Sequence, residues 1–407
     1  MSPPADPSSQ PAGRRPGFVS LVVLLALLQS ITPLSVDLYL PALPDIARAM
    51  GARQGALQLT LSGFMIGFGL GQLAWGPVGD RYGRKGPMLL GLLIYIAASA
   101  GCALAGDVWT LVGWRVLQAL GGCALPVLGS AMVRDCFDQE EGAKVRSWMT
   151  LIGAVAPLLA PLIGGQLMFL GPWPLMFWCL AGFGLVSLAG VLALPETLAP
   201  ENRRALHPWQ MVRGYGELLT DRTYLGYVLP ASLTMAGMMA YISGTPFVYI
   251  EYFHVPPQAY GLLFGVNMIG MMGASALNSA LLPRLSADRL FSMGCILVAA
   301  AGLALAAVAL TGFGGLISVV MAIFFYVSMV GPNSANAAAG ALQGFPHKAG
   351  AAAALIGCLS MALGALAGAL TGVFADGTPR PMALVMAVIG VSGLLCQRLV
   401  PDRRTLA

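Results

Sequence analysis

The feature that most constrains this chain is a series of apolar stretches, each about 20 residues long, that recur from near one terminus to near the other. A helix needs about this length to cross a hydrocarbon core of roughly 30 Å. Only 10% of the 407 residues are charged, against about 25% in an ordinary soluble domain, so much of the surface has to face lipid. The sequence predicts an all-α integral membrane protein, because barrel strands would show short alternating segments instead.

Turn residues and charges divide these stretches into twelve predicted spans, six on either side of a polar segment. The interval around 223–249 is interrupted by Pro230, Gly237, Gly244 and Pro246, so its ends are the hardest to place. The predicted spans are 18–40, 56–75, 87–105, 109–133, 146–168, 174–194, 223–249, 258–281, 290–310, 315–340, 350–373 and 382–399.

Two sets of six spans suggest a duplicated unit, with a transport pathway between the halves, as in many secondary transporters. The expected architecture is two pseudo-symmetric six-helix bundles in one chain, which is sufficient for function as a monomer. The expected segments are an N-terminal tail 1–17, a first bundle 18–194, a linker 195–222, a second bundle 223–399 and a C-terminal tail 400–407.

The basic residues indicate how the chain is oriented in the membrane. All but four of the 22 Lys and Arg residues fall on the side that holds both tails when the number of spans is even. The exceptions are Arg48, Arg53 and Arg380 on the opposite side and Arg115 inside a span. Because basic residues accumulate in cytoplasmic loops, both termini are predicted to be cytoplasmic.

One carboxylate and one guanidinium lie within predicted spans, Asp37 in the first and Arg115 in the fourth. A charge near the bilayer centre costs about 2.5 to 3.5 kcal/mol even on the milder scales, so such residues usually face a water-filled cavity or a partner. One interpretation makes Asp37 a site that alternately binds a proton and a substrate, with Arg115 close by. Another makes the two a structural ion pair, or places Asp37 in water near the helix end.

The fifth span has small residues at intervals of four and two internal prolines. Small residues let helices approach closely, while proline removes backbone hydrogen bonds and bends the helix. This pattern favours a close, bent contact between the halves, although an ordinary packing face would look similar. The small residues at this interval are Ala156, Ala160 and Gly164. Pro157, Pro161 and Gly165 form a second stripe beside them, and the segment begins at Gly153.

The segment from Gly76 to Gly86 is predicted to be a short loop between the second and third spans, with glycines that permit a sharp turn. Asp80 and Arg84 are placed to form an ion pair there. A simpler interpretation is a basic cytoplasmic anchor, in which the glycines serve only the turn.

Several apolar, aromatic and polar residues of the spans are candidates for the wall of a central substrate cavity. Stripes of this kind are also common in plain helix packing. The candidates are Tyr39, Phe64, Met65, Gln118, Tyr241, Asn267 and Asn333.

Four motifs together resemble the major facilitator superfamily, and more narrowly its bicyclomycin and chloramphenicol resistance exporters, the Bcr/CflA family. Gly76 to Lys85 is similar to the superfamily's motif between helices two and three. Gly153 to Gly165 is similar to the antiporter motif, although alanines stand at 156 and 160 where glycine is common. Arg115 with Gln118 resembles the fourth-helix motif, and Asp37 to Pro44 resembles the first-helix signature of the narrower family.

The resemblance extends to Pro246 to Ile250 and covers nearly the whole chain. It implies export of chloramphenicol-, florfenicol- or bicyclomycin-type drugs across a bacterial inner membrane, in exchange for protons bound at Asp37 with the help of Arg115. It implies gating by Gly76, Asp80, Arg81, Gly83 and Arg84. The expected partners are the drug, protons and the bilayer. No cofactor, metal or nucleic acid is expected, since the proton gradient supplies the energy.

Three rival functions stay open at this stage. An exporter of an amino acid or a sugar would share the fold. A membrane-embedded enzyme should carry clustered acids or histidines within its spans, whereas His207, His254 and His347 all lie outside them. A sensor built on the same scaffold would bind a ligand without transporting it.

Overall fold

A computed structural model describes residues 18–203, 215–345 and 348–399. Every regular element in these ranges is a helix, and no strand occurs among them. The elements of the first half are α1 (Phe18–Asp37), η1 (Leu40–Ala42), α2 (Leu43–Ala49), α3 (Gln54–Tyr82), α4 (Lys85–Ala103), α5 (Val108–Cys136), α6 (Gln139–Leu170) and α7 (Pro174–Ala193).

The second half follows a single turn of helix, η2 (Pro200–Asn202). Its elements are α9 (Arg222–Pro246), η3 (Phe247–Tyr252), α10 (Pro257–Leu281), α11 (Ala287–Thr311), α12 (Gly315–Ser328), α13 (Val330–Gln343), α14 (Ala349–Val373) and α15 (Arg380–Gln397).

The helices confirm the predicted all-α membrane fold. Within the described ranges, eleven helices or continuous helix pairs are long and apolar enough to cross a membrane. The apolar part of α6, Val155–Leu170, is a shorter helix that supplies the twelfth. The interval that seemed weakest in the sequence is one continuous span, because α9 continues past Pro230 to Pro246 and η3 extends it to Tyr252.

Two predicted spans are interrupted. The first stops as an α-helix at Asp37 and resumes as η1 and α2. Pro41 and Pro44 in this segment have no N–H to donate, so regular helix bonding cannot pass through it. The tenth span consists of α12 and α13, with Met329 between them and Pro332 just beyond.

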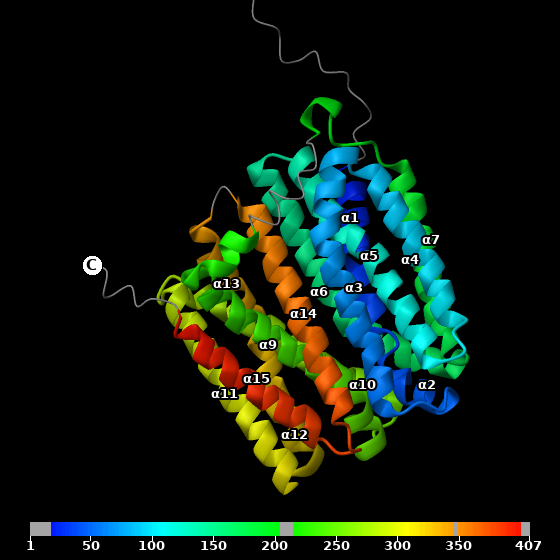
Figure 1. The fold of residues 1–407 in the computed structure, drawn as a ribbon, viewed down its shortest axis with the longest axis vertical. Coiled ribbons are helices and arrows are strands. Elements are labelled where there is room, and N and C mark those ends of the chain that lie inside the picture. The colour runs from blue at the N-terminus through cyan, green and yellow to red at the C-terminus, as the bar shows by residue number, and fades with distance from the viewer. Residues whose placement is uncertain (1–17, 204–214, 346–347, 400–407) are drawn as a thin grey trace, which may run out of the picture.

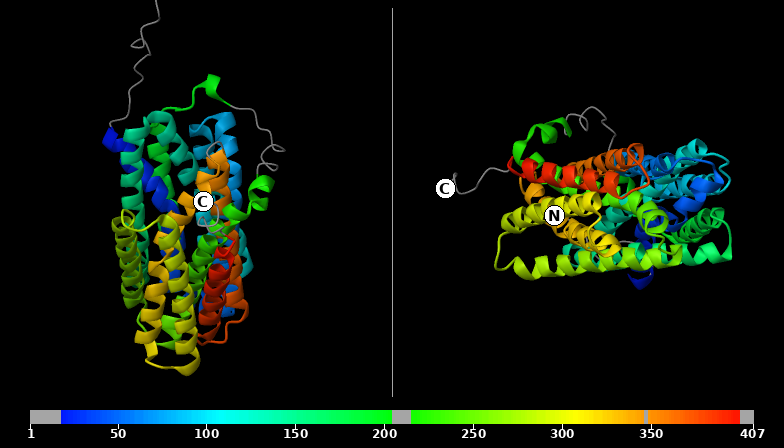
Figure 2. Two further views of the ribbon diagram at one scale, coloured as in Figure 1. Left: turned by 90° about the vertical axis from the view of Figure 1, so that its left-hand side faces the viewer. Right: turned by 90° about the horizontal axis from the view of Figure 1, so that it is seen from below.

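The polypeptide forms two groups of helices, α1–α7 and α9–α15, which lie beside each other in Figure 1. In Figure 1, α3, α4 and α5 run roughly along the long axis of the molecule, whereas α9, α11 and α15 are inclined to it. Figure 2 shows the same arrangement from the side and from below. The two groups meet where α3 packs on α14 and where α6 packs on α10. These are the most extensive contacts between the halves.

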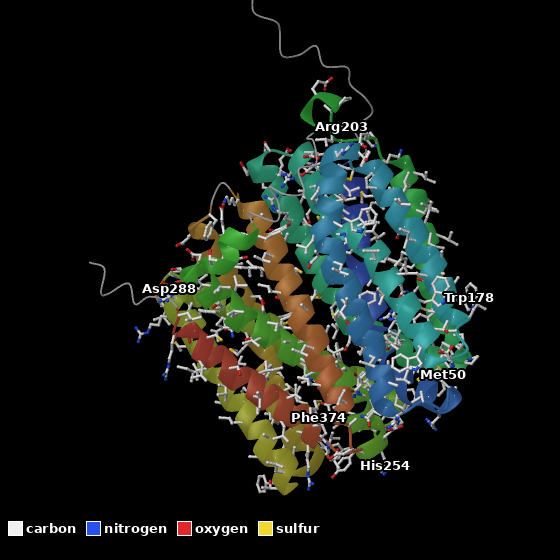
Figure 3. The ribbon with its side chains drawn as sticks, viewed as in Figure 1. Met50, Trp178, Arg203, His254, Asp288 and Phe374 are labelled. Carbon is white, nitrogen blue, oxygen red and sulfur yellow. The ribbon has the colours of Figure 1, made fainter. Side chains whose placement is uncertain are left out.

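We call the end of the molecule where α1 begins the tail side, and the opposite end, which holds α2 and η3, the far side. Figure 3 places Arg203 at the tail side and Met50, His254 and Phe374 at the far side. His207 and His347 lie outside the described residues.

The halves pack closely near the far side. A Cβ at Gly55 of α3 would collide with the carbonyl oxygen of Gly372 in α14. A Cβ at Gly261 of α10 would lie 2.8 Å from the backbone of Leu162 in α6. Glycine at these crossings lets the backbones approach as small residues do in other membrane helix pairs.

Candidate functional site

Arg115 on α5 is completely buried in the first half. Its guanidinium carbon lies 4.5 Å from the ring centre of Tyr39, 4.4 Å from that of Phe64 and 5.8 Å from that of Phe177. A cation within about 6 Å of an aromatic face is attracted by the negative face of the ring, most strongly when it is shielded from water. The three rings therefore stabilise this buried charge.

The hydrogen bonds of Arg115 satisfy only part of its guanidinium. Nη1 donates to Oε1 of Gln118, and Nε2 of Gln118 donates to Oγ of Ser99 at 2.8 Å. Nε and Nη2 of Arg115 are buried without a hydrogen-bond partner. Among the described residues no carboxylate lies within 4.0 Å of this guanidinium. Two donors are thus free for a polar group that enters from elsewhere.

Asp37 lies where α1 ends, and its side chain is buried. The adjoining segment η1 contacts α6 of its own half and both α9 and α10 of the other. Oδ1 of Asp37 has no hydrogen-bond partner, and no ion pair joins Asp37 to Arg115. The structural ion pair considered as one interpretation is therefore absent from this arrangement.

A cluster of tyrosines lies on α9 and α10, the helices of the second half that η1 contacts next to Asp37. Asn267 Nδ2 donates to the hydroxyl of Tyr241 at 2.9 Å, and the hydroxyls of Thr245 and Tyr260 are 3.1 Å apart. The carboxylate of the first half and the tyrosines of the second thus lie on elements that meet at the boundary between the halves.

The remaining cavity candidates lie elsewhere. Asn333 donates to Thr234 at 3.5 Å and packs against Gly294 of α11, so it belongs to the interior of the second half. Its place in a substrate cavity stays a prediction, since its amide oxygen is buried without a hydrogen-bond partner. Met65 is buried on α3 and joins the apolar core.

Sequence reasoning missed five residues of these clusters: Ser99, Phe177, Thr245, Tyr260 and Phe264. The ring of Phe264 stacks on Tyr241 at 5.6 Å. A tyrosine in an apolar span needs a partner for its hydroxyl, so Tyr260 carried a usable signal. Phe177 and Ser99 carried none, since each is ordinary in a membrane helix.

The predicted loop beginning at Gly76 is only partly a loop. Helix α3 continues through Gly76, Asp80 and Arg81 to Tyr82, and the break comes at Gly83, whose φ is 92°. The expectation of a loop was wrong for the first three because glycine and proline are tolerated inside membrane helices. Only glycine adopts the φ of the break without strain.

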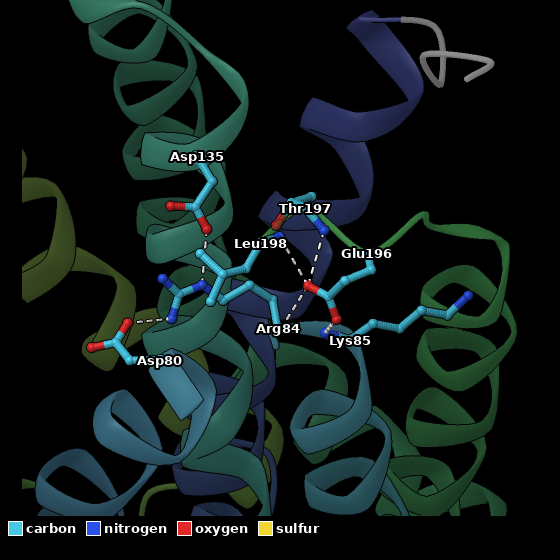
Figure 4. Close-up of polar contacts among 7 residues, drawn as sticks. All are labelled: Asp80, Arg84, Lys85, Asp135, Glu196, Thr197 and Leu198. Carbon is cyan, nitrogen blue, oxygen red and sulfur yellow. Dashed lines mark hydrogen bonds and ion pairs between the residues drawn. The ribbon is translucent and has the colours of Figure 1, made fainter. Parts of the chain in front are cut away.

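The expected contact between Asp80 and Arg84 is present, and it has a third member. Arg84 is 3% exposed and donates from Nη1 to Asp80 at 2.7 Å and from Nε to Asp135 of α5 at 2.8 Å (Figure 4). Arg81 takes no part and lies over the ring of Tyr82 at 5.2 Å. The ion pairs fix α3 to the tail-side end of α5.

Glu196 is a further member of this corner (Figure 4). Its carboxylate accepts from the backbone N–H groups of Arg84 at 2.8 Å and Lys85 at 3.1 Å, which begin α4, and of Thr197 and Leu198. Partial burial raises the pKa of Glu196, but these four donors outweigh it and hold the pKa below its usual value. Glu196 thus ties the chain after α7 to the first turn of α4.

The glycines of the fifth-span pattern lie at contacts. A Cβ at Gly164 would collide with the carbonyl oxygen of Leu38, next to Asp37, and one at Gly165 would lie 3.1 Å from Gln258 of α10. Gly153 faces Gln29 of α1 more loosely. Pro157 and Pro161 lie inside α6. Helix α6 therefore borders both the break after α1 and the second half.

The described part of the chain holds no group of three or more His, Cys, Asp or Glu side chains that could bind a metal. The clusters around Asp37 and Arg115 contain one acid, one guanidinium, amides, hydroxyls and aromatic rings.

A model of the Major Facilitator Superfamily matches residues 25–369. The "Uncharacterized MFS-type transporter YdgK" of Bacillus subtilis is 35% identical over 381 residues, covering 93% of this chain and 94% of its own. The "Bicyclomycin resistance protein homolog" of Haemophilus influenzae is 33% identical, covering 94% and 96%. The xylose transporter XylE from E. coli, partially occluded and inward open, has a TM-score of 0.74 at 14% identity, covering 95% and 98%.

The family match and the shared fold define a multi-pass membrane transporter, and the chain belongs to the major facilitator superfamily. Its curated relatives, which include a "Chloramphenicol resistance protein" of Pseudomonas aeruginosa at 30% identity, place it within that superfamily in the Bcr/CflA-like group.

Proposed function

We propose that this transporter exports small, neutral or weakly charged drug-like molecules of the chloramphenicol, florfenicol or bicyclomycin type, in exchange for protons. The observation that carries the proposal is the buried carboxylate of Asp37, which lies without a partner at the boundary between the halves. Relatives named for bicyclomycin and chloramphenicol resistance support the substrate class.

The proton cycle follows from the cost of burying charge. An isolated, unpaired carboxylate is expensive in a dry interface, so Asp37 holds a proton while the far side is closed. The proton leaves toward the tail side as substrate binds. When the halves rock and the far side opens, a new proton reaches Asp37 and weakens substrate binding there.

Arg115 is proposed to hold the substrate or to assist Asp37. Its unpartnered Nε and Nη2 can donate to an oxygen of the substrate, and Tyr39 and Phe64 offer aromatic faces to an apolar body. No cofactor takes part in this scheme.

The remaining assignments concern the moving parts. We infer that 18–194 and 223–399 rock as two bundles joined by the linker 195–222. The corner at Gly76, Asp80, Arg81, Gly83 and Arg84 gates the tail side, and the glycines and prolines of α6 provide the sliding contact. The tails 1–17 and 400–407 lie in the cytoplasm of a bacterium, and a single chain suffices.

The direct test is the accumulation of a chloramphenicol-type drug in cells that express the protein, with and without a protonophore. Expression should lower the accumulation, and collapse of the gradient should restore it. No difference across a small drug panel would favour an exporter of an amino acid or a sugar.

The coupling role of Asp37 has its own test. Asp37→Asn keeps the size of the side chain but cannot release a proton, so it should abolish gradient-driven export while the protein stays folded and inserted. Asp107→Asn, at an exposed helix cap, is the matched control. Full export by the Asp37 variant would remove Asp37 from the coupling role.

A further inference from the structure

An apolar groove lies on the far side between the end of α14 and the start of α15, apart from Asp37 and Arg115. It has a volume of about 540 Å³, within the range of small-molecule sites. Phe374 at its mouth is labelled at the far side of Figure 3. The lining consists of Leu370, Phe374, Asp376, Arg380, Pro381, Leu384, Val385, Val388 and Ile389.

The mouth of the groove carries one charge of each sign. Oδ1 of Asp376 accepts from the backbone N–H of Thr378 at 2.9 Å and from its hydroxyl at 2.7 Å. Slight burial raises the pKa of Asp376, but these hydrogen bonds and the nearby Arg380 lower it overall, so this carboxylate is charged at neutral pH. Arg380 is exposed, and within the described ranges no carboxylate lies within 4.0 Å of its guanidinium.

The depth of the groove suits a hydrocarbon chain. The lining extends along α15 from Arg380 to Ile389, which is roughly 13 Å at the rise of an α-helix. Below the mouth every lining residue is apolar, and Leu384 and Val388 are exposed. A ligand of matching shape has a hydrocarbon chain and a head that bears both an anion and a cation.

We propose that this groove binds a phosphatidylethanolamine molecule from the far-side leaflet, with an acyl chain along α15, the phosphate at Arg380 and the ammonium at Asp376. Phosphatidylcholine carries no N–H to donate to the carboxylate. Phosphatidylglycerol has no cation for Asp376 and is repelled by it. Charge complementarity therefore selects the ethanolamine head, and this site does not depend on what the protein exports.

The test uses the purified full chain in detergent, titrated with the three lipids of identical acyl chains and observed by native mass spectrometry. The wild type should carry roughly five times more phosphatidylethanolamine than either other lipid, the effect of about one exposed ion pair. Asp376→Asn keeps the oxygen that accepts from Thr378 and should abolish this preference. Arg380→Gln should lower the binding of all three lipids.

Asp107→Asn and Arg53→Gln, exposed far-side residues of the first half, are the matched controls and should leave the lipid preference unchanged. Val388→Trp fills the groove and should displace phosphatidylethanolamine. The proposal would be overturned if the wild type bound the three lipids equally, if the control variants lost the preference for phosphatidylethanolamine as Asp376→Asn does, or if Val388→Trp bound this lipid fully. Each of these outcomes would leave only ordinary contact with bulk lipid.

Discussion

At the scale of single residues, Asp37 and Arg115 lie in different surroundings, although each is the one charge of its sign within the predicted spans. Arg115 has aromatic faces and one amide, whereas Asp37 lies next to η1, which contacts α9 and α10 of the other half. Neither charge neutralises the other in this arrangement. A buried charge without a counter-ion favours a protonation change or a ligand, which makes both residues responsive to the transport cycle.

The contacts of Arg115 predict that lysine cannot replace it. A lysine ammonium is compact and cannot place a planar group between Tyr39 and Phe64 while it bonds to Gln118. Arg115→Lys should reduce the rate of drug export about tenfold, the equivalent of roughly 1.4 kcal/mol. Export measured in vesicles, with the exposed Arg53→Lys as control, checks this. Wild-type rates in Arg115→Lys would show that charge alone suffices.

Glu196 predicts a pH-dependent effect on stability. Glu196→Ala leaves the first N–H groups of α4 without an acceptor and should cost about 1 kcal/mol at pH 7, as for other helix caps. The pKa of Glu196 is lowered on folding, so its contribution is complete above about pH 4.3 and disappears as the pH falls through the lower folded value. The two proteins should therefore converge in melting temperature at acidic pH.

Thermal unfolding in detergent at pH 7 and at acidic pH measures this effect. Glu201→Ala, an exposed acid five residues further along, is the control. A loss at pH 7 that persists unchanged in acid would assign the effect to something other than the carboxylate.

At the scale of elements, the glycine crossing of α3 and α14 determines how closely the far side can close. The carbonyl oxygen of Gly372 occupies the position that a Cβ at Gly55 would take. Nearby, the amide of Gln58 is completely buried, and neither its nitrogen nor its oxygen has a partner. Water could satisfy this amide only if the crossing opened. The close contact between α3 and α14 therefore leaves one buried amide unsatisfied, which costs free energy in the closed arrangement.

This crossing predicts that Gly55→Val prevents the far side from closing. Distances between spin labels at Met50 and Phe374, in a background without native cysteines, should shift to longer values, and export should fall about tenfold or more. Gly273→Ala in α10, where a Cβ meets nothing within 4 Å, is the control. An unchanged distance distribution in Gly55→Val would show that the crossing does not limit closure.

At the scale of the whole molecule, the two halves close against each other at the far side, and the tail-side corner is held by ion pairs within the first half. Closure of one end by packing and control of the other by charge is consistent with alternate opening to the two sides of a membrane. The far-side leaflet also contains the groove between α14 and α15.

The charge distribution predicts how this molecule is oriented in the bilayer. A cysteine in place of His254 should react with a membrane-impermeant thiol reagent added outside intact cells, and one in place of Arg203 should react only after permeabilisation. Figure 3 places these two positions at opposite ends. The reverse pattern would place both tails outside and contradict the assignment from basic residues.

The sequence alone determined the features that depend on local composition. Span length and the cost of an intramembrane charge are properties of short segments, so the twelve apolar spans and the isolation of Asp37 and Arg115 could be predicted. The interruption after Asp37 could also have been predicted from Pro41 and Pro44, because proline lacks the N–H that a helix requires.

Only the tertiary structure decided which helix faces meet. Apolar residues dominate both the lipid-facing and the packed sides of these helices, so the sequence could not show that Arg115 lies among aromatic rings, that Asn333 serves its own bundle, or that Glu196 caps α4. Those contacts join residues far apart along the chain. The physical reason is that, within lipid, packing rather than hydrophobicity distinguishes one helix face from another.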